Sequence, residues 1–532
     1  MLGQSMPGRG EVRCAELIAS LCLATDLGMD LPFEHGLQST LFAMRLAERV
    51  GVDSATSTQT FYGCLLFYVG CTADADVSAE LFDDGALVAH FAPVMFGSRL
   101  QTMAGIARAL AGSGAWSASG AVRAAHRLPG ALAGHHRHVT ALCEVAQMLT
   151  DRLGLPPSVR DLFAALTERW DGKGDPGRLK GDEIPLALRI IHVARDAAFQ
   201  RLLGGDSYAA GVVQSRAGGA FDPAIAALFA AEATDIMALN DETSSWDAVL
   251  RLEPLPWLIL DAGAVDRALG AIGDFADLAS PYLVGHAAGV SELAAAAAQH
   301  VHLSTADVVM IRRAGLVHDI GRVAVPTRIW QKPDRLTPDD WEKVRLHPYH
   351  SDRILSPAAF LASLAPVAVA HHERLDGSGY PRRATASALP HTARLLAVAD
   401  AYHGMTEPRP HRAALSPEQA AELLGHQASF GRLDADGVAA VLDVAGQRAP
   451  HSARPAGLTE RETQVVALLA RGLQTKQIGR ALGISAKTAD RHVQNAYAKM
   501  GVSTRAAAAL FAMQHGLVMW GEFPIPGSAR HS

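Results

Sequence analysis

Histidines and aspartates recur between residues 286 and 400 in a pattern that could bind metal ions. His371 and His372 are adjacent, and His318 is followed directly by Asp319. Imidazole nitrogens and carboxylate oxygens are natural ligands for Mn, Fe and similar divalent ions, and one carboxylate can bridge two of them. We therefore predict two partly open octahedral sites, with Asp319 as the bridge. The predicted ligands are His286, His318, Asp319, His347, His371, His372 and Asp400.

Two divalent ions held in this way suit the hydrolysis of a phosphodiester. Ions about 3.5–4 Å apart can activate a bridging hydroxide and hold the phosphate during in-line attack. A single histidine is more often an ordinary surface or core residue, so the prediction depends on the joint occurrence of the set. Nothing in the sequence distinguishes the neighbouring histidines from ordinary polar positions: His300, His302, His350, His391, His403 and His411.

The first half of the chain is a degenerate copy of this region. Residues 168–176 align with residues 373–381, and residues 65–70 align with residues 316–321. The two copies agree at glycines, prolines and apolar positions, as expected after a duplication. They differ at the ligands, so copy one is predicted to keep the fold and lose the metal, as a structural or dimerising scaffold or as a pocket that binds a ligand without catalysis. In copy one, His318, Asp319, His371, His372 and Asp400 are replaced by Phe67, Tyr68, Leu166, Thr167 and Arg195, whereas His286 falls on His35.

Copy two, residues 280–446, resembles the HD-GYP domains, helical HD-superfamily phosphohydrolases that cleave cyclic di-GMP. Residues 318–321 match the HD signature, and residues 371–381 match the family's HHExxDGxGYP signature in full. His347-Pro348 and the run ending at Asp400 also fall in family order. The resemblance implies a helical bundle with two or three metal ions, and hydrolysis of cyclic di-GMP to its linear dinucleotide or to GMP.

Three departures from the family pattern affect the predicted chemistry. Arg322 stands where the family usually has a lysine that contacts the substrate phosphate, and arginine keeps the charge with a bidentate geometry. We predict Asp319 and Arg322 as catalytic residues. Tyr282 replaces the glutamate of members with three metals, so two ions, Mn or Fe, are expected. The run 401–405 is altered, which leaves another nucleotide or phosphate ester as an alternative substrate.

The glycine-rich turn after the paired histidines is the predicted substrate loop. Its candidate residues are Asp376, Gly379, Tyr380 and Pro381. Copy one keeps the same turn at residues 171–174, which favours an architectural role for Asp376 and the glycines. Tyr380 has no counterpart in copy one and is expected to contact substrate or a partner protein.

The C-terminal segment has the pattern of a small DNA-binding domain. Two short helices joined by a turn that contains Gly483 are typical of a helix-turn-helix. Donor side chains repeat at three- and four-residue spacing on the predicted third helix, suited to a major groove. Residues 457–517 resemble the LuxR-type helix-turn-helix, which implies DNA binding as a dimer. The predicted DNA-binding residues are Lys487, Thr488, Arg491, His492, Asn495 and Lys499.

Composition sets the limits of the remaining functions. The 532 residues carry a net charge of −6, so the overall charge does not indicate nucleic-acid binding, and any basic region must be local. The five cysteines form no CxxC pair, which favours free thiols in a reducing compartment. No signal peptide is recognisable, and no apolar run is long enough to span a membrane. We expect a cytoplasmic protein without a membrane segment.

We predict an all-α protein with two tandem HD-type helical bundles followed by a four-helix LuxR-type domain. Predicted bounds are 1–240 for the degenerate copy, 241–446 for the phosphohydrolase, 447–457 for a linker, 458–520 for the DNA-binding domain and 521–532 for a loose tail. We predict that the protein is a transcriptional regulator in which a cyclic di-GMP phosphodiesterase domain is coupled to DNA binding. We also expect a homodimer. The alternative is a transcription factor whose HD domain senses a ligand with little turnover.

Overall fold

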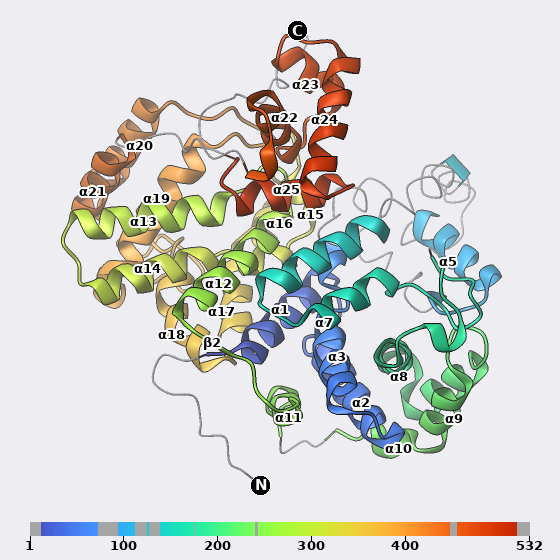
Figure 1. Ribbon diagram of the computed structural model, residues 1–532. Coiled ribbons are helices and arrows are strands. Elements are labelled where there is room, and N and C mark those ends of the chain that lie inside the picture. Colours follow the sequence, from blue (N-terminus) through green and yellow to red (C-terminus); the bar gives the residue numbers. More distant parts are fainter. Residues whose placement is uncertain are drawn as a thin grey trace. The chain divides into compact units, whose positions relative to one another are not determined.

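The computed structural model describes residues 12–72, 94–111, 125–126, 139–175, 177–239, 243–446 and 455–518. Contacts between residues divide the chain into two compact units, residues 1–264 and residues 265–532. Helices dominate both units, and the only strands in the described ranges are two residues long (Figure 1). The prediction of an all-α fold is therefore confirmed.

Unit 1 is a helical bundle in which the long α8 packs against α2, α3 and α9. The short strands β1 and β2 pair antiparallel, Val12 with Leu260, and Arg13 forms an ion pair with Glu253. Residues 243–264 therefore pack in unit 1, whereas the sequence predicted that the second domain begins at residue 241. The elements are β1 (Val12–Arg13), α1 (Cys14–Gly28), α2 (His35–Val50), α3 (Ser54–Leu65), η1 (Val69–Thr72), α5 (Arg99–Ala111), α7 (Pro157–Leu162), η4 (Phe163–Ala165), η5 (Gly181–Glu183), α8 (Leu186–Ser215), α9 (Pro223–Ala231), α10 (Ala233–Ile236), α11 (Ser245–Arg251) and β2 (Ile259–Leu260), and residues 139–152 are also helical.

The second bundle is built around α13, which packs against α14, α19 and α21 (Figure 1). Five alanines of α13 are buried, so neighbouring helices can approach it closely. The elements are α12 (Ala262–Asp277), α13 (His286–His300), α14 (Thr305–Val317), η6 (Ile320–Ala324), α15 (Thr327–Trp330), α16 (Pro338–Arg345), α17 (His347–Leu355), α18 (Ala359–Ala368), η7 (Ala386–Ala388), α19 (His391–Thr406), α20 (Pro417–Ser429) and α21 (Ala435–Ala445).

The helices of the two copies begin at matching positions. α2 and α13 start at the aligned residues His35 and His286. Asp53 caps α3 by accepting from the amide of Thr56, and the aligned Ser304 caps α14 in the same way. Capping side chains satisfy the first amide groups of a helix, which have no partner within it. The duplicated sequence thus fixes the same helix starts twice.

The C-terminal domain has the four helices that the sequence predicts. Thr459 and Glu462 form a capping box at the start of α22, and Ser485 caps α24. Val465, Leu469 and Ile478 are buried in one core, against which Tyr497 packs. The elements are η8 (Pro455–Gly457), α22 (Glu460–Ala470), α23 (Thr475–Ala481), α24 (Ala486–Met500) and α25 (Arg505–Gln514).

Some predictions fall partly outside the described ranges. Most of the linker, residues 447–454, and the tail, residues 521–532, belong to this part of the chain. The side chain of Cys71 does too, whereas Cys14, Cys22, Cys64 and Cys143 are free thiols. Within the described ranges, no helix combines the length and the apolar character needed to cross a bilayer.

Candidate metal centre

Helix ends bring the predicted ligands together around Asp400, which lies inside α19. His286 is the first residue of α13 and His347 the first of α17. His318 is the C-cap residue directly after α14, and Asp319 follows it. All seven predicted ligands lie within the second bundle, and six of them are almost completely buried, His372 being the exception.

Three of the histidines share one local device that fixes their ring nitrogens. In each ring, Nδ1 lies within hydrogen-bond distance of a backbone carbonyl oxygen, which can only accept, so Nδ1 must carry the proton. This leaves Nε2 unprotonated and able to bind a metal ion. The acceptor is always the residue three positions earlier: Gly315 for His318 (2.7 Å), Val344 for His347 (2.6 Å) and Ala368 for His371 (2.7 Å).

The first group of ligands is His286, His318, Asp319 and Asp400. Nε2 of His318 lies 2.8 Å from Oδ2 of Asp319, and Nε2 of His286 lies 3.4 Å from the same oxygen. Oδ1 of Asp400 lies 3.2 Å from Nε2 of His286 and 3.7 Å from Nε2 of His318. Two imidazole nitrogens and two carboxylate oxygens thus converge on one point.

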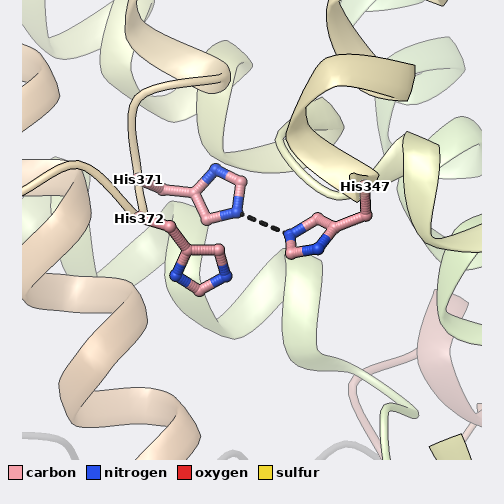
Figure 2. Close-up of side chains that lie close together, drawn as sticks. All are labelled: His347, His371 and His372. Carbon is pink, nitrogen blue, oxygen red and sulfur yellow. Dashed lines mark hydrogen bonds between the residues drawn. The ribbon is translucent and has the colours of Figure 1, made fainter. Parts of the chain in front are cut away.

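The second group is His347, His371 and His372, which face one another in Figure 2. Nε2 of His347 lies 3.1 Å from Nε2 of His371, the contact drawn as a dashed line. The ring centroids of His371 and His372 are 4.2 Å apart. Three imidazoles from α17 and from the segment after α18 therefore form a second nitrogen-rich site.

The two carboxylates connect these groups. Oδ2 of Asp319 faces the first group, whereas Oδ1 lies 3.2 Å from Nε2 of His347 and 3.3 Å from Nε2 of His371. Asp400 also faces both ways, since its Oδ2 lies 3.7 Å from Nδ1 of His372. Asp319 thus contacts both groups of histidines, and its role as a bridge between two ions stays a prediction.

These residues fit divalent metal ions on several grounds. Nε2 of His286, Nε2 of His318 and both oxygens of Asp319 are buried and form no hydrogen bond of good geometry among the described residues. Buried polar atoms of this kind need a partner. Ligands bonded to an ion at about 2.1 Å lie about 3.0 Å apart when they are adjacent, close to the donor separations found here. The mixture of imidazole and carboxylate suits Mn or Fe.

The electrostatics of the site favour charged carboxylates. Burial would raise the pKa of the Asp319 carboxyl, but Arg322 and His318 hold that pKa well below its ordinary value. Burial would likewise raise the pKa of Asp400, which His286 and His318 hold well below its ordinary value. Both aspartates are therefore ionised and can act as metal ligands.

Arg322 is buried beside the predicted bridge. Its Nη2 lies 2.6 Å from Oδ2 of Asp319, and its guanidinium lies over the ring of Trp330 at 5.5 Å from the centroid. Nε and Nη1 are buried and have no hydrogen-bond partner among the described residues. These two donors could bind the oxygen atoms of a phosphate, although the role of Arg322 in catalysis stays a prediction.

The predicted substrate loop divides into an architectural part and a part that reaches the site. Oδ1 of Asp376 accepts from the amide and hydroxyl of Ser378, which closes the turn. A Cβ at Gly379 would lie 2.4 Å from the amide nitrogen of Arg374, and Gly174 is equally crowded in copy one. Tyr380, which precedes Pro381, stacks on His372 with 4.8 Å between ring centroids, so its ring adjoins the second ligand group.

Copy one has filled the equivalent place with aromatic rings and an arginine. The guanidinium of Arg195 lies 4.1 Å from the centroid of Tyr68 and 5.3 Å from that of Phe67. Phe96 packs on His192, whose Nε2 donates to the backbone of Leu166. A fixed cation therefore stands where copy two has Asp400, and no set of metal ligands remains in the described part of copy one.

Two site residues were not recognised from the sequence. Glu407 accepts from Nδ1 of His286 at 3.0 Å, and it also lies 3.0 Å from Nδ1 of His403. Both are buried. His403 appeared ordinary in the sequence, and Glu407 was not considered. The sequence could have indicated both residues, because copy one has Ala198 and Leu202 at the matching positions and therefore differs there as it does at the ligands.

On the C-terminal domain, α24 exposes Lys487, Thr488, Arg491 and Asn495, and His492 is half-buried. The structure separates Lys499 from this group. Its ammonium lies 2.6 Å from Oε2 of Glu462 and donates to the carbonyl of Gly457, because the C-terminal end of α24 packs beside the start of α22.

Two models of known protein families match the chain. The model of the HD domain matches residues 101–225 and 271–437, which is more than half of the chain and includes parts of both copies. The chain belongs to the HD-domain family. The model of bacterial regulatory proteins of the luxR family matches residues 456–512, so the HD-domain protein also carries a LuxR-type helix-turn-helix domain.

Relatives of this HD-domain protein include enzymes that act on cyclic dinucleotides. The 3′3′-cGAMP-specific phosphodiesterase 3 of Vibrio cholerae is 27% identical over 415 residues, which cover 77% of this chain and 90% of that protein. The cyclic di-GMP phosphodiesterase response regulator RpfG of Xanthomonas campestris is 35% identical over 176 residues, 31% of this chain and 46% of that protein. The solved structure of V-cGAP3, a cyclic GMP-AMP-specific phosphodiesterase of V. cholerae, aligns with 83% of this chain and 99% of its own at a TM-score of 0.56 and 23% identity, which shows a shared fold.

Proposed function

We propose that copy two is a metal-dependent phosphodiesterase that hydrolyses a cyclic dinucleotide. The observation that carries the proposal is the position of Asp319, whose two oxygens face two separate groups of histidines. Two ions bound there would supply an activated water for attack on phosphorus and would neutralise charge on the phosphate oxygens. The residues of the chain hold that arrangement: Asp319 and Asp400 span both groups, and the free donors of Arg322 are placed to bind a phosphate oxygen.

The substrate class rests on the relatives. A relative that matches across both copies is named for 3′3′-cGAMP, and among the shorter matches of higher identity some are named for cyclic di-GMP and others for 3′3′-cGAMP. Cyclic di-GMP, the substrate predicted from the sequence, and 3′3′-cGAMP are both 3′,5′-linked rings of two nucleotides. We propose this class, and the assay ranks its two members.

The test is hydrolysis by the full-length protein loaded anaerobically with Mn or Fe. Wild type, Asp319→Ala and Tyr68→Phe are each given cyclic di-GMP and 3′3′-cGAMP, and the products are separated by chromatography. Tyr68 aligns with Asp319 in copy one, so Tyr68→Phe should keep full turnover and metal content. Asp319→Ala should lose both. A folded, metal-loaded wild type that hydrolyses neither compound would refute the proposal and favour a ligand sensor with little turnover.

We further propose that nucleotide occupancy changes DNA affinity through the LuxR-type domain of a homodimer. The exposed donors on α24 support DNA binding, and the fusion of the two domains in one chain supports the coupling. Fluorescence anisotropy of labelled DNA, with and without a non-hydrolysable cyclic dinucleotide analogue bound to the metal-loaded wild type, measures it. Equal DNA affinities in the two states would refute the coupling.

A further inference from the structure

A buried charged group adjoins the predicted ligands at the end of α19. Oε2 of Glu407 accepts from Nδ1 of His286 at 3.0 Å and from Nη2 of Arg409 at 2.8 Å. Oε1 of Glu407 lies 3.0 Å from Nδ1 of His403. His286, His403 and Glu407 are all buried, so each contact is shielded from water. Glu407 thus fixes the proton on Nδ1 of His286, as backbone carbonyls do for three of the other ligand histidines.

The packing of α13 is adapted to this group. A Cβ at Gly289 would lie 1.9 Å from Nε2 of His403, so any larger residue at position 289 would clash with the imidazole. Copy one has Gln38 in place of Gly289 and Ala198 in place of His403. The size exchange between facing positions shows that copy two makes room for His403.

Two arginines hold the end of α19 in place. Nη1 of Arg409 donates to the carbonyl of Tyr282, just before α13, at 2.6 Å. Arg412 donates to the carbonyls of Met405 and Glu407, which lie at the end of α19 and have no partner within the helix. The carboxylate of Glu407 is therefore fixed relative to the start of α13, where His286 lies.

We propose that Glu407 is a positioning residue that orients His286 and thereby sets the affinity of the first ligand group for its metal ion. A carboxylate that accepts from the distal nitrogen of a ligand histidine fixes its tautomer and raises its basicity. Nε2 of His286 then faces Asp319 and Asp400 as an unprotonated ligand. His286, His403 and Glu407 are also close enough to hold an ion, but the guanidinium of Arg409 on Oε2 and the hydrogen bond from Nδ1 of His286 favour a hydrogen-bonded group. This inference rests on the proposed metal centre.

The experiment measures Mn²⁺ affinity and stoichiometry in the full-length protein by competition with a chelator, without reference to turnover. The variants are Glu407→Ala, Glu407→Gln, His286→Ala and the double variant His286→Ala/Glu407→Ala. We expect Glu407→Ala to weaken the affinity by about 10–100-fold. Glu407→Gln keeps an oxygen that can accept from Nδ1 and should lose less than tenfold. In the His286→Ala background, removal of Glu407 should change the affinity by less than about twofold.

A matched control separates positioning from general stability. Asp340 is a buried carboxylate paired with Lys332, and it contacts none of the predicted ligands. Asp340→Ala should lower the melting temperature and leave Mn²⁺ affinity unchanged. The inference is overturned if Glu407→Ala binds Mn²⁺ as tightly as wild type, if its loss persists in the His286→Ala background, or if it removes one whole ion that His286→Ala retains. If Glu407→Ala fails to fold, Glu407→Gln and its double variant with His286→Ala decide the question. A wild type that binds no Mn²⁺ refutes the proposed metal centre instead.

Discussion

Replacing Arg322 tests whether its free donors bind the substrate phosphate. Nη2 is used by Asp319, whereas Nε and Nη1 are buried and available. A hydrogen bond to a charged group contributes about 1.5–3 kcal/mol, so two such bonds to a phosphate contribute about 3–6 kcal/mol. At about 1.4 kcal/mol per tenfold, Arg322→Ala should lower kcat/KM by about 10²–10⁴-fold.

The lysine variant makes the test more specific. Arg322→Lys keeps the positive charge and loses the planar pair of donors. If one of the two bonds survives, the loss is about 1.5–3 kcal/mol, or about 10–100-fold in kcat/KM. The order should be wild type, then lysine, then alanine.

The assay is steady-state hydrolysis of whichever cyclic dinucleotide the protein cleaves, at fixed metal content. Arg382→Ala is the matched control, because this exposed arginine lies in the neighbouring loop and pairs with Asp352 at 2.7 Å. Its kcat/KM should stay within about twofold of wild type, as is usual for exposed ion pairs. If Arg322→Ala retains kcat/KM within threefold, Arg322 does not bind the phosphate and serves only to pair with Asp319.

Three further outcomes follow from the structure. In the DNA-binding domain, Arg491→Ala should reduce the slope of log affinity against log salt by about one, whereas Lys499→Ala should leave the slope unchanged because Lys499 pairs with Glu462; equal slopes in titrations of labelled duplex DNA would contradict this. Metal at 100 times its dissociation constant stabilises the fold by about 2.7 kcal/mol. A chelator should therefore lower the Tm of wild type by about 5–11 °C and leave the Tm of Asp319→Ala unchanged. The same Tm shift in both proteins would contradict a specific metal site. Burial raises the pKa of Asp26 from 3.8 to about 7, against the lowering effect of the Gly36 amide and of Arg195. The contribution of the protonated Asp26 carboxyl to stability is therefore complete below pH 4 and falls by up to about 4 kcal/mol as pH rises to about 7. Asp26→Asn should flatten the fall in Tm over this range, and parallel Tm profiles for variant and wild type would contradict the expected role of Asp26.

The duplication made the fold predictable from the sequence to an unusual extent. Glycines that both copies share proved to mark places where the backbone approaches closely, as at Gly174 and Gly379. The helix starts at His35 and His286, and the caps at Asp53 and Ser304, follow from the same agreement. The end of unit 1 was harder to predict, because the pairing of β1 with β2 joins residues about 250 positions apart and involves only two residues per strand.

The same comparison between the copies could have been carried further at the candidate site. Asp400, His403 and Glu407 have spacings of three and four residues, which place them on one side of α19. In copy one the three positions hold Arg195, Ala198 and Leu202, so the whole face changed, and not only the predicted ligand. A residue that supports a ligand is lost for the same reason as the ligand itself, since nothing retains it once the ion is gone. The sequence does not indicate which ligand Glu407 contacts. Glu407 lies seven residues beyond Asp400, and only the 3.0 Å contact with Nδ1 of His286 connects it to a ligand 121 positions earlier in the chain.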